Sequence, residues 1–213
     1  MKNNYLCVPI HTLSGEIVAL DLRQADRSGS PAPPDEDPEA VLLNQLLTLE
    51  QYADYFSQRG LLCSVSINFQ LAKAVVQSPF LQQILSHLPF VRLKVSEDFP
   101  NLHDGPDNPI LRELVGQLNI LWLDDLGAGD ANLNALQSSM FEAVKLDRQF
   151  YLDNIDKPFF TILIAHIRQY TNRVIVEGSE GGLQLEKLAA SKIWAVQGYF
   201  APAMPLETLE ATD

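Results

Sequence analysis

The chain has few basic residues, no long apolar run and only two cysteines, and each shortage excludes a class of protein. Its 15 Lys and Arg residues stand against 27 Asp and Glu residues, so the formal net charge at pH 7 is −12. Long-range repulsion by this charge opposes direct binding to nucleic acid and to an anionic membrane. No stretch approaches the ~18 consecutive apolar residues that span a bilayer, and residues 1–10 lack the apolar run of a signal peptide. We therefore expect a cytoplasmic protein.

The two cysteines do not indicate a disulfide framework or a metal site. Cys7 and Cys63 lie inside apolar, strand-like runs, and neither has a second Cys or a nearby His at the spacing of a metal site. We interpret both as reduced, buried thiols. With 213 residues, 46% of them apolar, the chain is long enough for one well-filled core. We expect a single domain over residues 1–213.

Strand-like and helix-like segments alternate after residue 60. The expected strands are 61–69, 91–97, 120–124, 143–146, 173–177 and 193–197, and the expected helices are 71–87 (one or two), 109–118, 133–138, 159–170 and 183–191. This alternation predicts βα units with parallel strands. The near-continuous apolar run of residues 119–123 (NILWL) is typical of a strand that is covered on both faces.

The N-terminal part follows a different pattern. Residues 5–12 and 16–23 flank a Ser14-Gly15 turn and predict an antiparallel hairpin. Residues 26–38, with four prolines, predict an exposed loop that leads into a helix over residues 39–58. The hairpin brings the strand count to about eight, which favours an α/β fold: a TIM-like (β/α)8 barrel with an antiparallel N-terminal strand pair. An open doubly wound sheet is the alternative.

Polar clusters stand at the carboxyl ends of the predicted strands, where a barrel or a doubly wound sheet carries its active site. They are residues 124–129 (DDLGAG), 144–148 (VKLDR), 177–180 (EGSE) and 197–199 (QGY). In this order they resemble the DDFGTG, LKIDR, EGVE and QGY motifs of the EAL domain family. Active members of that family hydrolyse cyclic di-GMP with two divalent metal ions. The resemblance covers nearly the whole chain and implies an EAL-type barrel.

The resemblance also assigns positions to the family's chemistry. Two metal ions need several carboxylates around them, and hard cations prefer oxygen ligands. The positions that match the family's metal ligands are Asp21, Asn68, Lys94, Asp124, Asp125 and Glu177. The positions that match its catalytic and supporting residues are Lys145, Glu180 and Gln197.

Two of the matched positions depart from the family pattern. Residues 18–23 (VALDLR) place Asp21 where the EAL motif has its Glu, which is one methylene longer. Residues 93–97 (LKVSE) place Lys94 where a glutamate ligand stands, while Glu97 matches the next glutamate. An ammonium ~4 Å from a divalent ion would be repelled by about 8 kcal/mol at an effective dielectric constant of 20. We therefore expect a vestigial site without metal, cofactor or catalysis, in which Lys94 pairs with Asp21, Asp124 or Glu177.

The loop after the aspartate pair also differs from the family. Residues 130–132 (DAN) replace its Tyr-Ser-Ser, and the added carboxylate of Asp130 would repel an anionic dinucleotide. Binding of cyclic di-GMP is therefore not expected. We interpret Trp122, Trp194, Phe159 and Phe160 as core or helix-packing residues and not as platforms for a ligand.

A scaffold that does not hold its metals must act by binding. Residues 126–129 (LGAG) and 96–102 (SEDFPNL) resemble a short, degenerate subgroup of the family, the YdiV-like anti-FlhDC regulators. The resemblance implies a protein that binds the FlhD subunit of the flagellar master activator FlhDC and represses flagellar genes and motility. It would be a monomer before binding, and its partner-binding surface stays unassigned. The alternative is a cyclic di-GMP phosphodiesterase or a cyclic di-GMP receptor.

Overall fold

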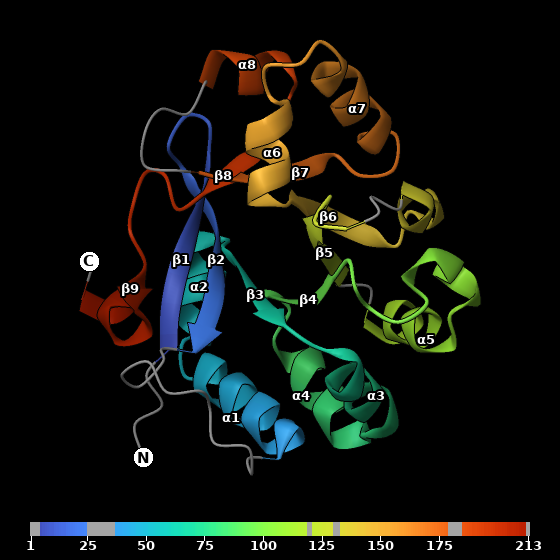
Figure 1. Ribbon diagram of the computed structural model, residues 1–213. Coiled ribbons are helices and arrows are strands. Elements are labelled where there is room, and N and C mark those ends of the chain that lie inside the picture. Colours follow the sequence, from blue (N-terminus) through green and yellow to red (C-terminus); the bar gives the residue numbers. More distant parts are fainter. Residues whose placement is uncertain (1–4, 25–36, 119–120, 130–132, 179–184, 212–213) are drawn as a thin grey trace.

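Eight strands close into a β-barrel with helices around its outside in the computed structural model, which describes residues 5–24, 37–118, 121–129, 133–178 and 185–211 (Figure 1). The strands are β1 (Tyr5–Thr12), β2 (Ile17–Gln24), β3 (Leu62–Ser66), β4 (Val91–Ser96), β5 (Leu121–Leu126), β6 (Phe141–Leu146), β7 (Arg173–Glu177) and β8 (Ala195–Gln197). From β2 to β8, neighbours along the chain pair in parallel.

The barrel closes through β1, which pairs antiparallel with both β2 and β8. A short strand, β9 (Met204–Pro205), pairs with the other end of β1. The predicted TIM-like barrel with an antiparallel N-terminal strand pair is therefore confirmed, and the open-sheet alternative is wrong.

The helices lie outside the barrel (Figure 1). They are α1 (Pro38–Glu50), α2 (Ala53–Arg59), α3 (Phe69–Gln77), α4 (Pro79–His87), α5 (Pro109–Leu118), α6 (Arg148–Asn154), α7 (Phe159–Ile167) and α8 (Leu185–Ala190), with the 3-10 helices η1 (Leu102–Asp107), η2 (Leu133–Ser138) and η3 (Leu206–Ala211). Within the described residues, no helix combines the length and the apolar character needed to cross a bilayer.

Two helix predictions differ from the structure. The helix expected over residues 39–58 is split, because α1 ends at Glu50 and α2 starts at Ala53. Helix α6 was not predicted, although an Asp stands at its start: the side chain of Asp147 accepts a hydrogen bond of 2.7 Å from the backbone N–H of Phe150. This is the N-cap arrangement that Asp favours at a helix start.

The apolar core has an inner and an outer part. Inside the barrel, one layer of buried side chains, which we call the waist, consists of Ile10, Ala19, Trp122, Ala143, Ile175 and Ala195. A larger cluster fills the space between the strands and the helices, and it includes Leu42, Leu46 and Phe160. Packed layers of inward-facing side chains are the usual filling of such barrels.

The structure tests the interpretation of the aromatic residues and the cysteines. Trp122 and Phe160 are buried, and Trp194 packs against the waist, as expected. Phe159 was expected to be a core or helix-packing residue; it does not belong to the core, because 46% of its surface is exposed at the start of α7. Cys7 and Cys63 are buried free thiols, as predicted.

A cluster of charges closes the barrel at the amino ends of the parallel strands. Glu142 forms ion pairs with Arg92 and Arg173, and it accepts a hydrogen bond of 2.9 Å from the Trp122 indole N–H. The register between β5 and β6 skips Glu142, so a bulge lies at this residue. A bulge changes which way a strand side chain points, and here it lets one carboxylate meet both arginines.

Candidate functional site

Charged side chains also meet at the opposite end of the barrel, where the parallel strands reach their carboxyl ends. The Lys94 Nζ lies 2.9 Å from Asp21 Oδ1 and 2.7 Å from Asp124 Oδ2. The Lys145 Nζ lies 3.0 Å from Asp124 Oδ1 and 3.5 Å from Glu177 Oε2. One ammonium group thus bridges two carboxylates, and a second extends the network to a third carboxylate.

Parallel strand pairing positions these groups. Asp21 on β2 is in register with Ser64 on β3, and Ser66 on β3 is in register with Lys94 on β4. Side chains alternate between the two faces of a strand, so Asp21, Ser64 and Lys94 all face the barrel interior. Along each strand, the polar residue of the network comes at the second inward-facing position or later, so it lies beyond the apolar waist.

The carboxylate of Asp21 has four hydrogen-bond donors around it. Oδ1 accepts from the Ser64 hydroxyl at 2.7 Å and from Lys94. Oδ2 accepts from the Gln197 side-chain amide at 2.9 Å and from Arg23 Nε at 3.1 Å. Because Asp21 is only 1% exposed, these donors replace the water that a carboxylate would otherwise bind.

The charges stabilise one another in the ionised state. Burial would raise the pKa of Asp21, but the Coulombic attraction of Lys94 and Lys145 outweighs it and holds that pKa well below its usual range. The pKa of Asp124 is lowered by the same two lysines against the same effect of burial. Burial would lower the pKa of Lys94, and the attraction of Asp21 and Asp124 raises it instead. At neutral pH this is a salt-bridge network, which already contains its own cations.

This donor set does not fit a pair of divalent metal ions. The oxygens of Asp21 and Asp124 that point to the centre of the network already contact the Lys94 ammonium. A cation that used the same oxygens would lie within a few ångströms of that ammonium and be strongly repelled. Within the described part of the chain, no group of three or more His, Cys, Asp or Glu side chains is arranged to hold a metal ion.

Other matched residues bind the backbone around the site. The side-chain oxygen of Asn68 caps α3 by accepting a hydrogen bond of 2.9 Å from the Leu71 N–H. Glu97 Oε2 accepts hydrogen bonds from the N–H groups of Gly127 and Gly129, at 2.8 and 3.2 Å. Asp125 has a left-handed backbone, with φ of 55°, and both burial and the charge of Asp124 raise its pKa.

Gly127 occupies a place that no other residue fits. Its φ is +101°, and a Cβ atom would lie 2.4 Å from the Phe150 ring. The loop of residues 124–129 therefore packs directly on α6. The Asp147 N–H, which donates to the Leu126 carbonyl at 3.0 Å, joins the same two segments.

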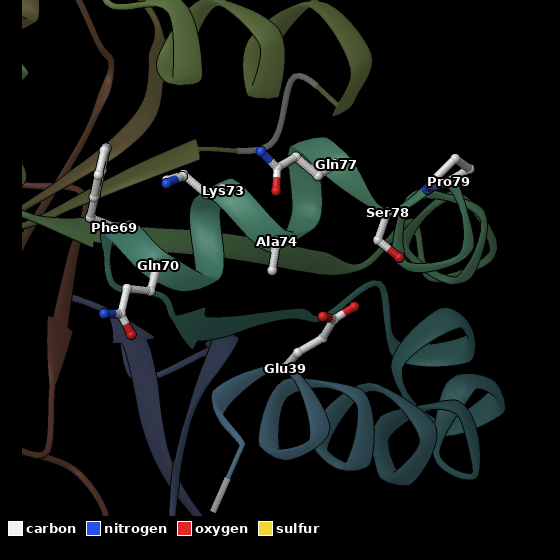
Figure 2. A pocket seen from close by; sticks show the side chains of 8 residues that line it. All are labelled: Glu39, Phe69, Gln70, Lys73, Ala74, Gln77, Ser78 and Pro79. Carbon is white, nitrogen blue, oxygen red and sulfur yellow. The ribbon is translucent and has the colours of Figure 1, made fainter.

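Three hollows lie near the site or outside the barrel. A hollow of about 430 Å³ is next to the network and is lined by Ser66, Asn68, Lys94, Ser96 and Asp124, among others. A second, of about 620 Å³, lies between residues 96–103 and the loop of Asp125 and Gly129. The third, of about 680 Å³, lies outside the barrel between α1 and α3, and Figure 2 shows Glu39 reaching from α1 toward α3. Its wall includes the polar side chains of Gln70, Lys73 and Gln77 on α3, together with Phe69, Ala74 and Pro79.

The structure brings most of the predicted site residues together. Those that meet in one network are Asp21, Lys94, Asp124, Lys145, Glu177 and Gln197. Asn68 and Asp125 lie at its rim, in the wall of the smallest of the three hollows. Glu180 and Asp130 lie outside the described residues. Of the three partners expected for Lys94, Asp21 and Asp124 are observed, whereas the ion pair of Glu177 is with Lys145.

Two residues of the network were missed. Ser64 donates to Asp21 from the neighbouring strand, and Arg23 donates to it from two residues along β2. Alternation along residues 62–66 could have indicated that Ser64 faces inward. The same alternation applies to Arg23, which lies two residues after Asp21 on β2 and therefore on the same face of the strand.

Comparison with known proteins places these features in context. The EAL domain family matches residues 40–203. Cyclic di-GMP phosphodiesterase PdeH of Escherichia coli (strain K12) is 31% identical over 175 residues, which cover 79% of this chain and 66% of PdeH. The anti-FlhC(2)FlhD(4) factor YdiV of Salmonella arizonae is 23% identical over 178 residues, which cover 82% of this chain and 75% of that protein. The chain thus spans about two thirds to three quarters of these relatives.

A solved structure agrees with the fold. The crystal structure of the EAL-like domain protein YdiV superimposes with a TM-score of 0.86, covering 98% of this chain and 95% of that one at 24% sequence identity. Because the identity is low, this agreement concerns the arrangement of strands and helices.

Proposed function

Because the chain belongs to the EAL domain family, we propose that it is a catalytically inactive member that binds the FlhD subunit of FlhDC and represses flagellar gene expression and motility. One observation carries the proposal: the Lys94 ammonium lies between Asp21 and Asp124, at 2.9 and 2.7 Å. The relatives named anti-FlhC(2)FlhD(4) factor support the choice of partner.

The charge arrangement supports the proposed absence of catalysis. Two-metal hydrolysis needs carboxylates that are free to bind the ions and to activate water between them. Here Lys94 and Lys145 occupy those carboxylates. We assign the positions of Asp21, Asn68, Lys94, Asp124, Asp125 and Glu177 as vestigial ligand positions, and those of Lys145, Glu180 and Gln197 as vestigial catalytic positions. Six of these residues now hold the carboxyl ends of the strands together: Asp21, Lys94, Asp124, Lys145, Glu177 and Gln197.

The proposal includes the form in which the protein acts. We infer a single EAL-like domain over residues 1–213, monomeric before it binds its partner, that acts in the cytoplasm and needs no cofactor. The net charge of −12 supports action through a protein and not through DNA.

The test is a titration of the purified chain with purified FlhD, followed by isothermal calorimetry and size-exclusion chromatography. A stable complex that reduces the binding of FlhDC to promoter DNA is the expected result. In a parallel titration, cyclic di-GMP with Mn²⁺ should give no binding heat and no hydrolysis. Failure to form a complex with FlhD would remove the proposed partner.

A cyclic di-GMP phosphodiesterase or receptor is the second candidate. It is favoured by the 31% identity to PdeH over 175 residues, and by the carboxylates of Asp124, Asp125 and Glu177 at strand ends. Hydrolysis of cyclic di-GMP by the unaltered chain, at a rate within the usual enzymatic range of about 1–1000 per second, would establish this candidate.

A further inference from the structure

The backbone turn at the end of β5 is bonded directly to the salt-bridge network. Asp124 Oδ2 lies 2.7 Å from the Lys94 Nζ, and Asp124 Oδ1 lies 3.0 Å from the Lys145 Nζ. Oδ1 also accepts a hydrogen bond of 3.0 Å from the Asp125 N–H, which is the first peptide group of the turn. The orientation of the Asp124 carboxylate therefore determines where the turn begins.

The turn of residues 125–128 has a strained backbone that the sheet does not hold. Asp125 has a φ of 55°, in the left-handed region, which residues other than glycine seldom adopt and keep only where the surroundings hold them. The register between β5 and β6 is interrupted from Leu123 to Leu126, so regular strand pairing is absent at Asp125. The bond from the Asp125 N–H to Asp124 and the bond of 3.0 Å from the Ala128 N–H to the Asp125 carbonyl hold the turn instead.

The same turn positions the start of α6 and the walls of two hollows. The Asp147 N–H, directly before α6, donates to the Leu126 carbonyl at 3.0 Å, and Gly127 packs against the ring of Phe150 on α6. On its other side, Asp125 lines both the hollow of about 430 Å³ and the hollow of about 620 Å³. A displacement of the turn would therefore move the first residues of α6 and reshape both hollows.

The ammonium of Lys94 is what keeps the Asp124 carboxylate in this orientation. It separates Asp124 from Asp21, and without it the two buried carboxylates would face and repel each other. Asp21 is held by three further donors, which are Ser64, Gln197 and Arg23. Among the described residues, Asp124 would keep only Lys145 and the Asp125 N–H. Asp124 is therefore the carboxylate that would move, and the turn would move with it.

We propose that the Lys94–Asp124 ion pair is a conformational latch that holds residues 125–128 in their strained turn and, through them, the start of α6. Lys94 is part of the chain and only 5% exposed, so its charge does not dissociate. The turn therefore keeps one conformation at any concentration of divalent metal ion in the solution. This inference does not depend on the identity of the partner protein.

The test is hydrogen exchange at single backbone amides, measured by NMR. The rates at Asp125 and Asp147 are each divided by the rate for the amides of α4 (Pro79–His87), which corrects for global unfolding. In Lys94→Met, the corrected rates should rise by about 10-fold or more, the loss expected when a hydrogen bond to a charged group is weakened. Lys94→Gln, which keeps a neutral donor toward Asp124, is the milder second variant and should raise the same two rates by a smaller factor.

Glu142→Gln is the matched control, because it removes a paired charge at the opposite end of the barrel, and it should leave both corrected rates unchanged. Mn²⁺ and EDTA should leave them unchanged in the unaltered chain. The latch is overturned if the two Lys94 variants protect Asp125 and Asp147 as well as the unaltered chain does, or if Glu142→Gln accelerates both amides equally. Slower exchange of the unaltered chain in Mn²⁺ would overturn the independence from metal ions. FlhD is absent from these measurements, so their outcome and the outcome of the FlhD titration are separate.

Discussion

The two ends of the barrel pair their charges in opposite ways. At the amino ends of the strands, one carboxylate, Glu142, lies between two guanidinium groups, those of Arg92 and Arg173. At the carboxyl ends, one ammonium, that of Lys94, lies between two carboxylates, those of Asp21 and Asp124. Neither arrangement requires an ion from solution. The carboxyl end, where an EAL enzyme would bind metal, is therefore built like the amino end, with positive and negative groups exchanged.

The two ends differ in their contact with water. The side chain of Asp21 is 1% exposed and that of Lys94 is 6% exposed, whereas the side chain of Glu142 is 29% exposed. Removing one partner of a buried ion pair leaves the other charge without compensation, while water compensates a partly exposed charge. Substitutions at the carboxyl-end network should therefore destabilise the fold more than substitutions at Glu142.

The largest effect is expected from Lys94→Met, which removes the central cation and keeps a side chain of similar length. The free energy of unfolding should fall by about 3–5 kcal/mol, because Asp21 and Asp124 are left buried and close together. Urea denaturation measures this change. Lys73→Met on the exposed surface of α3 is the control, and it should change stability by less than about 0.5 kcal/mol. A loss equally small in both variants would contradict the central role of Lys94.

The second effect concerns the metal. The double substitution Asp21→Glu with Lys94→Glu replaces the ammonium by a carboxylate and lengthens its neighbour, so the donor set becomes that of a cation site. Mn²⁺ should raise the melting temperature of this variant, by the equivalent of about 2.7 kcal/mol at 100 times the dissociation constant, and leave the unaltered chain unchanged. Two Mn²⁺ ions bound to the unaltered chain in a crystal would refute the exclusion of metal by Lys94.

A smaller effect is expected at the amino end. Glu142→Gln keeps the side-chain shape and an acceptor for the Trp122 N–H, but it removes the negative charge between Arg92 and Arg173. Stability should fall by about 1.5–3 kcal/mol at most, the value of hydrogen bonds to a charged group, and water should reduce the loss further. The same urea experiment measures it. A loss that exceeds that of Lys94→Met would reverse the order of the two ends.

The smallest effect is on the pH dependence of stability. The folded-state pKa values of Asp21, Asp124 and Glu142 are all lowered. A carboxyl group whose pKa is lowered by folding stabilises the protein at pH values above its unfolded-state pKa of about 4. This stability is lost as the pH falls through the folded-state pKa. The unaltered chain should therefore lose stability below about pH 4. In Lys94→Met the loss in this range should be shallower than in Glu142→Gln, because two of the three lowered pKa values depend on Lys94. Unfolding free energies measured at intervals from pH 6 to lower values test this difference, and equal slopes would contradict it.

The sequence was sufficient to predict the barrel and the centre of the network. Alternating segments identified the strands, and polar residues at their carboxyl ends must converge when parallel strands close a barrel. The resemblance to the EAL family added Asp21 and Lys94 to the same site as Asp124, and the structure brings these three residues together. Their pairing follows from opposite charge on inward-facing side chains at the strand ends: Lys94 on β4 is next to Asp124 on β5, and it reaches Asp21 on β2 across β3.

Features that depend on register or on long side chains could not be predicted. Glu142 faces the barrel axis only because a bulge shifts β6 against β5, and no local pattern in residues 141–146 indicates that bulge. Alternation along β2 places Arg23 on the same face as Asp21, but it does not specify the side-chain rotation that brings the Arg23 Nε to the carboxylate. The 46% exposure of Phe159 could not be predicted because apolar composition alone does not show which side chains of α7 face the core.

The apolar waist between the two ends has a practical consequence for protein engineering. Its six residues have no ionisable side chain, and the indole N–H of Trp122 is directed to Glu142. Among the described residues, the waist therefore provides no chain of hydrogen bonds between the two charged layers. The changes in unfolding free energy caused by substitutions in the two layers should add, within about 0.5 kcal/mol. The residues at the carboxyl ends of the strands could therefore be redesigned to bind a new ligand without changing the charge cluster at the amino ends.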